Sequence, residues 1–308
     1  MLTVEENEIG ILIQGMKQAY LRGENMMAWA KLNRKSDSNS IASTLISYDF
    51  QAGSYVSIAR TGVETNQKWC KQLAHLLAPH IEEGDKILEA GVGEATTLVG
   101  VMQAIGKENL SFFGFDLSWS RIKIAKEWAN DHAVKPELFV GDLFHIPIAD
   151  NAIDVIYTSH SLEPNSGKEL LAMRELLRVA RKAVILVEPI YELASEAGQK
   201  RMVEHGYVRN LKAIAEAEGM HVEKYGLLDY THNSINPSGI VLISKPAPIT
   251  RREGGGDGAF WQCPLTACVL INQGDVFYAS DAGIAYPVMR DIPLLRKEHA
   301  VVASKLDS

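Results

Sequence analysis

Apolar and polar positions follow two different rhythms along the middle of the chain. Residues 67–81 repeat apolar side chains at helical spacing, with Trp69, Leu73 and Leu77 on one face. Similar helical patterns occur at residues 119–129 and 168–181. Short segments that are apolar at nearly every position lie between and around them, at residues 86–90, 112–116, 137–140, 153–158 and 183–188. Continuous apolar strands separated by helices are typical of a parallel sheet covered on both faces.

The pattern changes after the fifth strand. Residues 205–219 predict one helix, and residues 221–226 and 239–244 predict two closing strands. A plain dinucleotide-binding fold would add further helical crossovers at this point. We therefore expect an α/β fold, with a doubly wound, mostly parallel sheet of seven strands.

The pattern of apolar and polar residues divides the chain into four segments. Residues 1–65 contain helical stretches at 9–21 and 26–32 and a polar break at 33–40, so they predict a helical cap or lid. The sheet domain occupies residues 66–248. Glycine and charged residues at 249–258 predict a flexible linker. Residues 259–308 are too few to hold a large core alone and predict a small β-rich domain.

Composition narrows the class of protein. The 308 residues carry a net charge of -7 and no block of basic residues, which argues against a nucleic-acid partner and favours a small-molecule or protein substrate. No apolar segment approaches the length of a membrane span, and the acidic start does not resemble a signal peptide. Three cysteines are too few for a disulfide framework. We expect a cytoplasmic protein without a membrane partner, and the sequence leaves open whether it forms a homo-oligomer.

Polar residues and glycines stand where the predicted strands end. Ligands bind at that edge of an open parallel sheet. Gly91 and Gly93 allow a tight turn after the first strand, but a lone pair of glycines is weak evidence. A dinucleotide site would need glycine or alanine where Thr96 stands, and Glu94 at the start of the next helix would repel a pyrophosphate. Asp116, which ends the second strand, can accept hydrogen bonds from a ribose. These residues favour a cofactor with adenosine, no phosphate and a cationic sulfonium.

Three motifs carry a resemblance to a known family. Residues 87–97 (ILEAGVGEATT), 113–117 (FGFDL) and 141–157 (GDLFHIPIADNAIDVIY) resemble, in order and spacing, successive motifs of the class I S-adenosylmethionine (SAM)-dependent methyltransferases. The resemblance covers residues 67–245, about three-fifths of the chain. It implies a Rossmann-like fold and SAM as the cofactor.

The resemblance also assigns residues to parts of the cofactor. It implies that Asp116 holds the ribose and that Leu117 lies beside the adenine. It implies that Asp142 binds the adenine amino group, that Leu143 packs on the ring, and that Ser159 lies at the edge of the cofactor. The residues that it places along the methionine part are Glu89, Gly91 and Gly93.

Methyl transfer depends mainly on alignment of the acceptor, and a base is needed only for a weak nucleophile such as a hydroxyl. The candidates for this base at the sheet edge are His160, Glu163 and Glu188, with His232 and Tyr191 as further candidates. A histidine here can equally form part of the cofactor wall, Glu163 can cap the next helix, and Glu188 can end a strand. Residues 48–55 mix aromatic and hydrogen-bonding groups, which indicates either a lid over the substrate or ordinary packing.

The C-terminal segment carries a second resemblance. Residues 261–295 are similar to the zinc-ribbon family that activates tRNA and protein-release-factor methyltransferases, chiefly at Cys263-Pro264 and residues 286–295. A structural zinc site of that family needs two Cys-x-x-Cys pairs. Cys268 does not restore one, because Thr266, Ala279 and Ala282 stand at the positions of the other ligands. We expect no bound metal.

Together these features predict a SAM-dependent methyltransferase that acts on a small molecule, and we expect the acceptor group to be a hydroxyl of a sugar or another biosynthetic intermediate. One alternative is a tRNA or protein methyltransferase with a fused activator-like domain. Another is a non-catalytic, cofactor-binding scaffold.

Overall fold

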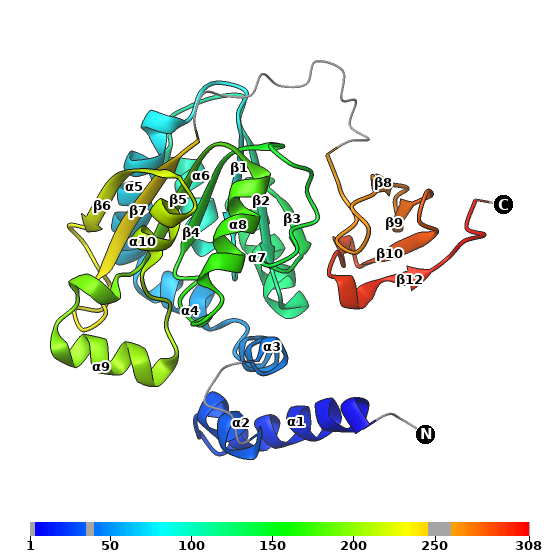
Figure 1. The fold of residues 1–308 in the computed structure, drawn as a ribbon, viewed down its shortest axis with the longest axis horizontal. Helices are drawn as coiled ribbons and strands as arrows, with labels where there is room; N and C mark the ends of the chain where they lie inside the picture. Colours follow the sequence, from blue (N-terminus) through cyan, green and yellow to red (C-terminus); the bar gives the residue numbers. More distant parts are fainter. Residues whose placement is uncertain (1–3, 35–39, 246–259, 308) are drawn as a thin grey trace.

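A computed structural model describes residues 4–34, 40–245 and 260–307 (Figure 1). The proposed linker at 249–258 and residues 35–39 of the polar break lie outside this described part. No helix within the described ranges is both long and apolar enough to cross a membrane.

Seven strands form one sheet in the order β3-β2-β1-β4-β5-β7-β6. Strands β1 to β5 are parallel, and β7 is antiparallel to both β5 and β6. This arrangement confirms the expected α/β fold with its doubly wound, mostly parallel sheet. The strands are β1 (Lys86–Ala90), β2 (Ser111–Asp116), β3 (Glu137–Val140), β4 (Ile153–Ser159), β5 (Ala180–Pro189), β6 (His221–Leu227) and β7 (Ser238–Ser244).

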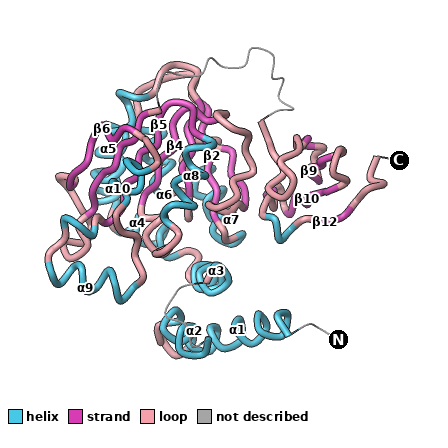
Figure 2. The backbone as a smooth tube through the Cα atoms, in the orientation of Figure 1, coloured by secondary structure: helices cyan, strands magenta, loops and turns pink. Residues whose placement is uncertain are grey.

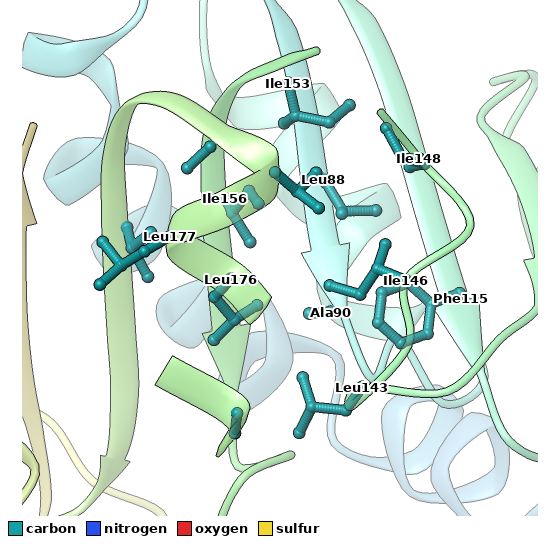
Figure 3. Close-up of a cluster of buried hydrophobic side chains, with 14 of the residues drawn as sticks. Leu88, Ala90, Phe115, Leu143, Ile146, Ile148, Ile153, Ile156, Leu176 and Leu177 are labelled. Atoms are coloured by element: carbon teal, nitrogen blue, oxygen red, sulfur yellow. The ribbon is translucent and has the colours of Figure 1, made fainter. Parts of the chain in front are cut away.

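Helices cover both faces of the sheet (Figures 1 and 2). On one face, α5 (Val63–Leu77), α6 (Thr96–Ala104) and α7 (Trp119–Asp131) share an apolar core with the strands. On the other face, α8 (Glu169–Val179) and α10 (Leu211–Ala217) do the same. Figure 3 shows Leu176 and Leu177 of α8 among sheet residues such as Leu88 and Ile156. Burial on both faces explains why the strands are apolar throughout.

The single helix predicted at residues 205–219 is wrong in its bounds. The structure has α9 (Glu196–His205), a break, and then α10 from Leu211. Gly206 ends α9 with a φ of 72°, in the left-handed region that glycine adopts readily. The short 3₁₀ turns η1 (Ala78–His80), η2 (Tyr191–Leu193) and η4 (Lys297–His299) complete the helical elements named here.

Four helices precede the sheet domain: α1 (Val4–Leu21), α2 (Met26–Arg34), α3 (Ile41–Phe50) and α4 (Ser54–Thr61). The first three share a separate apolar cluster that includes Met16, Met26 and Ile46. In Figure 1, α1 and α2 lie beyond α3, whereas α4 lies against the sheet domain. These helices form the expected N-terminal helical extension.

A separate small antiparallel sheet follows near the C-terminus. Its strands are β8 (Ile271–Asn272), β9 (Val276–Ala279), β10 (Ile284–Met289), β11 (Ile292–Pro293) and β12 (Val301–Val302). In Figure 1 this sheet lies beside β3, the edge strand of the large sheet. The amide of Leu295 donates a hydrogen bond of 2.9 Å to the carbonyl of Val140. The ring of Trp261 packs edge-on against Phe139, with the ring centroids 5.1 Å apart.

Candidate active site

A cavity of about 640 Å³ opens where the parallel strands end. Side chains that end or follow β1, β2, β3 and β4 meet there because parallel strands bring their carboxyl ends to one edge. One sequence-predicted site residue, Glu188, is not among the residues that line the cavity. The predicted residues that do line it are Glu89, Gly91, Gly93, Asp116, Leu117, Asp142, Leu143, Ser159, His160 and Glu163.

The glycine turn after β1 is packed closely against the segment after β4. Gly91 has a φ of 74° and Gly93 a φ of 55°. A side chain at position 91 would place its Cβ 2.3 Å from the Cβ of Ser161, which is too close for any side chain. Glycine is therefore required at position 91 both by the backbone conformation and by the close approach.

Glu89 is a buried carboxyl group in the floor of the site, 2% exposed. The hydroxyl of Tyr157 donates a hydrogen bond of 2.7 Å to Oε2 of Glu89, since the two residues are register partners on β1 and β4. Burial raises the pKa of Glu89 to about 8, although the Tyr157 hydrogen bond opposes this shift. A positively charged ligand group beside this carboxyl would favour its ionised form.

Asp116 links the turn after β1 to the start of α7. Its Oδ2 accepts a hydrogen bond from the amide of Gly93 at 3.1 Å, and its Oδ1 accepts one from the amide of Ser118 at 2.9 Å. Burial raises the pKa of Asp116, and the nearby Arg121 opposes the shift. Each carboxylate oxygen can accept a second hydrogen bond, so the group can also hold two hydroxyls of a ligand.

Asp142 has one carboxylate oxygen without a partner. Oδ1 accepts a hydrogen bond from the amide of Phe144 at 3.0 Å. Oδ2 is buried and has no hydrogen-bond partner within the described structure, and Nδ1 of His145 lies 3.9 Å away. An unpaired buried carboxylate oxygen is costly, and an amino group of a ligand would satisfy it. The residues present therefore fit an adenosine-containing cofactor with an exocyclic amino group.

The N-terminal helices supply one wall of the cavity, through Tyr48 of α3 and Tyr55 of α4. Both tyrosine rings pack against the guanidinium of Arg121, at 4.6 and 4.7 Å from its central carbon. The Nε of Arg121 also donates a hydrogen bond of 3.0 Å to the carbonyl of Tyr48. Arg121 is not among the residues that the sequence predicts for the site. The signal for it is its position in the first turn of α7, five residues after Asp116.

Glu94 joins the same wall in a way that the sequence did not indicate. Its carboxylate accepts hydrogen bonds from the amides of Gly53 at 2.9 Å and Val56 at 2.7 Å. Gly53 is the N-cap residue of α4 and Val56 lies in its first turn, and the N-cap residue supplies no side-chain hydrogen bond. The sequence indicates only that the charge of Glu94 would repel a pyrophosphate. In the structure Glu94 also caps α4 and anchors this helix to the glycine turn.

His160 lies directly after β4 with a φ of 58°, an uncommon conformation for a residue with a side chain. Its Nε2 lies 2.8 Å from the hydroxyl of Ser238, and its ring packs edge-on against Trp69. Burial and the neighbouring His232 lower the pKa of His160 to about 4, so its ring is neutral near pH 7. Ser159 accepts a hydrogen bond of 3.3 Å from the indole of Trp69.

The two candidate carboxyl groups differ in position. Burial and the charge of Glu188 raise the pKa of Glu163 to about 8 at the cavity wall. Glu188 is fully buried and accepts hydrogen bonds of 3.1 Å from the amides of Ser161, Leu162 and Glu163. Its contacts give it a role in holding the loop after β4, and we do not propose it as a base.

His232 and Tyr191, the two further candidates for the base, also differ in position. His232 lines the cavity, with its ring 4.8 Å from that of Trp69. Tyr191 is not among the lining residues, and its ring packs against Arg209.

Comparison with known proteins adds independent information. A family model described as a methyltransferase domain matches residues 87–183. This range contains the glycine turn, Asp116 and Asp142. A search of proteins with curated descriptions found no significant match.

Solved structures are similar to this chain at low sequence identity. A methyltransferase in complex with the Trm112 methyltransferase activator of Haloferax volcanii is 16% identical, with a TM-score of 0.50, and the match covers 65% of this chain and 98% of that one. A SAM-dependent methyltransferase from Aquifex aeolicus is 19% identical, with a TM-score of 0.42 and coverage of 55% and 87%. The magnesium protoporphyrin IX methyltransferase of Synechocystis PCC 6803, solved with bound SAM, is 16% identical, with a TM-score of 0.45 and coverage of 58% and 79%.

The sheet order, the fit of the strand-end residues to an adenosine cofactor and the match to the family model agree. The protein is a SAM-dependent methyltransferase with a Rossmann-like class I fold.

Proposed function

We propose that the protein methylates a small molecule on a hydroxyl group, with the acceptor held between the sheet edge and the N-terminal helices. The observation that carries this proposal is the shared cavity. Its wall contains Tyr48, Tyr55, Ile58 and Thr61 from α3 and α4 as well as the strand-end residues. A volume of about 640 Å³ lies in the range of small-molecule sites.

Each part of the cofactor has a proposed partner. Glu89, Gly91 and Gly93 line the methionine part, where the buried carboxyl group favours a positively charged amino group. Asp116 holds the ribose hydroxyls. The residues proposed around the adenine and at the edge of the cofactor are Leu117, Asp142, Leu143 and Ser159.

The bound cofactor supplies an electrophilic methyl group on a sulfonium. The protein's own contribution is to orient the acceptor, which can account for most of the rate enhancement in a displacement of this kind. Tyr55 and Arg121 hold the N-terminal wall in place, and the aromatic side chains there exclude water from the cavity. The candidate bases that line the cavity are His160 and Glu163, which follow β4, and His232. His160 is neutral near pH 7 and can accept a proton from a hydroxyl acceptor, whereas Glu163, with a pKa of about 8, can do so once it is ionised.

A second candidate function has one observation in its favour. The small C-terminal sheet covers the edge strand β3, and the methyltransferase that shares the fold at a TM-score of 0.50 was solved with an activator protein. A C-terminal domain derived from such an activator would suit a tRNA or protein acceptor. The net charge of -7 weakens the tRNA version, because RNA binding depends on basic surfaces.

Labelled methyl transfer separates these candidates. The purified full-length protein is incubated with methyl-labelled SAM and, separately, with a metabolite extract, total tRNA and a protein extract. We expect label only in the metabolite fraction. Label confined to tRNA or protein would replace the small-molecule proposal with the second candidate. The Asp116→Ala variant, assayed in parallel, controls for contaminating methyltransferases.

A further inference from the structure

Three polar side chains from distant parts of the chain form a row of hydrogen bonds beside the cavity. His160 follows β4, Ser238 begins β7, and Thr231 lies in the loop between β6 and β7. Nε2 of His160 lies 2.8 Å from Oγ of Ser238, and this oxygen lies 3.1 Å from Oγ1 of Thr231. Ser238 is fully buried, so its hydroxyl depends on these two neighbours.

The number of available protons decides which group donates and which accepts at each contact of this row. Each hydroxyl has a single proton to donate. The hydroxyl of Thr231 donates it to the carbonyl of Asn233 at 3.3 Å, and its oxygen accepts the amide proton of Ser238 at 3.1 Å. With the Thr231 proton on the Asn233 carbonyl, the contact between the two hydroxyls uses the proton of Ser238. In this arrangement Oγ of Ser238 accepts at its contact with His160, which assigns the ring proton to Nε2.

The other ring nitrogen of His160 is free. Nδ1 has no hydrogen-bond partner among the described residues, and it is not one of the buried atoms without a partner. His160 lines the cavity, and its ring is neutral because its pKa is lowered. In a neutral imidazole with a proton on Nε2, Nδ1 is a hydrogen-bond acceptor.

The surroundings hold the ring in this orientation. The backbone amide of His160 donates to the carbonyl of Val187 at 2.9 Å, in the left-handed conformation described above. The ring centroid lies 5.4 Å from that of Trp69. A strained backbone that its surroundings hold in place is often found at a functional site.

We propose that Thr231 and Ser238 hold His160 in its Nε2–H tautomer, so that Nδ1 accepts a hydrogen bond from an O–H or N–H group of the methyl acceptor. Thr231 and Ser238 are positioning residues in this arrangement, and His160 is the residue that contacts the acceptor. The inference rests on the proposed function for the identity of the ligand, but the tautomer itself does not depend on it.

This arrangement restricts the class of acceptor. A hydroxyl, a primary amine or a secondary amine can donate a hydrogen bond to Nδ1. A tertiary amine or a thioether has no proton to donate. The structure therefore favours acceptors whose reacting atom, or an atom next to it, carries a proton.

Nitrogen-15 NMR of the full-length protein, labelled at histidine, tests the tautomer directly. The His160→Gln variant identifies the His160 signals. In the wild-type protein with S-adenosylhomocysteine near pH 7, we expect a protonated Nε2 and an unprotonated Nδ1. Thr231→Val frees the Ser238 proton to donate to Nε2, so Nδ1 should become protonated in a large share of molecules. Thr231→Ser should keep the wild-type tautomer.

Ser244→Ala is the matched control, because Ser244 lies at the other end of β7 and its buried hydroxyl has no hydrogen-bond partner in the described structure. It should leave the His160 signals unchanged. A wild-type proton on Nδ1, or an unchanged tautomer in Thr231→Val, would overturn the inference.

Methyl transfer to the metabolite fraction gives a second readout. Thr231→Val should lower the transfer rate about tenfold, as expected when one orienting hydrogen bond is lost, while the affinity for S-adenosylhomocysteine stays within about twofold. If Thr231→Val alters the tautomer but leaves the transfer rate unchanged, Nδ1 of His160 does not bind the acceptor. Absence of transfer with the expected tautomer would count against the proposed function and not against the hydrogen-bonded row.

Discussion

Asp116 accepts hydrogen bonds from the backbone amides of Gly93, in the turn after β1, and Ser118, before α7, and these bonds pre-organise its carboxylate for a ligand. Asp116→Ala should weaken binding of S-adenosylhomocysteine at least tenfold, since hydrogen bonds to a charged group contribute roughly 1.5–3 kcal/mol. Isothermal titration calorimetry measures the change. Asp131→Ala, in the exposed last turn of α7, is the control and should bind normally. Equal affinities in the two variants would remove the ribose assignment.

Glu89 makes cofactor binding depend on pH. Its folded-state pKa of about 8 lies above its ordinary value, so the free protein holds a proton there near pH 7. The stability from this protonated form is present at low pH and is lost as the pH rises toward 8. A cationic ligand favours the ionised carboxylate, so SAM affinity should rise with pH, by up to about tenfold per unit below pH 8, and level off above it.

Calorimetric titrations with SAM between about pH 6 and pH 9 test this dependence. Glu89→Gln cannot ionise, and its affinity should be lower and nearly independent of pH in this range. A flat profile for the wild-type protein would show that the charge of Glu89 is not coupled to the cofactor.

At this scale, the sequence predicted which residues gather at the strand ends but not what each of them contacts. Glu89 and Asp116 end parallel strands, so their common edge follows from the topology. The Tyr157–Glu89 hydrogen bond depends on strand register, which the apolar pattern of a fully buried strand does not specify. Glu188 also ends a strand, but its carboxylate turns toward three amides of the next loop.

Among the elements, α4 depends on a carboxylate from another part of the chain. Glu94→Gln replaces the charged cap of α4 and should destabilise this helix by about 1 kcal/mol. Hydrogen exchange at residues 54–61 should become faster, while β1 and β4 keep their protection. Glu64→Gln, at an exposed position in the first turn of α5, is the control. Unchanged exchange in α4 would show that the cap is not needed.

The strands were predicted closely, and the helices around residues 205–219 and 41–61 were not. Short continuous apolar runs bounded by turn residues indicate buried strands through their length and their flanking residues. The segments α3, α4 and α9 bury only part of their surface, and their ends depend on contacts such as the Glu94 cap. Gly206 is a helix stop signal that the sequence shows inside the helix predicted at residues 205–219, and the structure places it in the left-handed conformation.

At the scale of the whole molecule, Trp261 connects the small sheet to the large one. Its ring contacts Phe139 on β3 and Phe277 on β9. Trp261→Ala should lower the free energy of unfolding by about 3 kcal/mol and expose β3 to hydrogen exchange. Denaturant unfolding and exchange at residues 137–140 measure both effects. Leu265→Ala, at a half-exposed position of the same region, is the control. If Trp261→Ala lowers the free energy of unfolding no more than Leu265→Ala does, the ring of Trp261 does not dock the small sheet.

Coverage of the β3 edge by the same chain has a consequence for how the enzyme behaves on dilution. A sheet supplied by a separate chain would dissociate at low protein concentration, and coverage of β3 would then depend on the supply of both chains. Here the C-terminal sheet is covalently tied to the strand that it covers, so its effective concentration is set by the length of the chain between them. The complex between the two units then has a fixed one-to-one ratio, and its integrity does not depend on how much protein a cell makes.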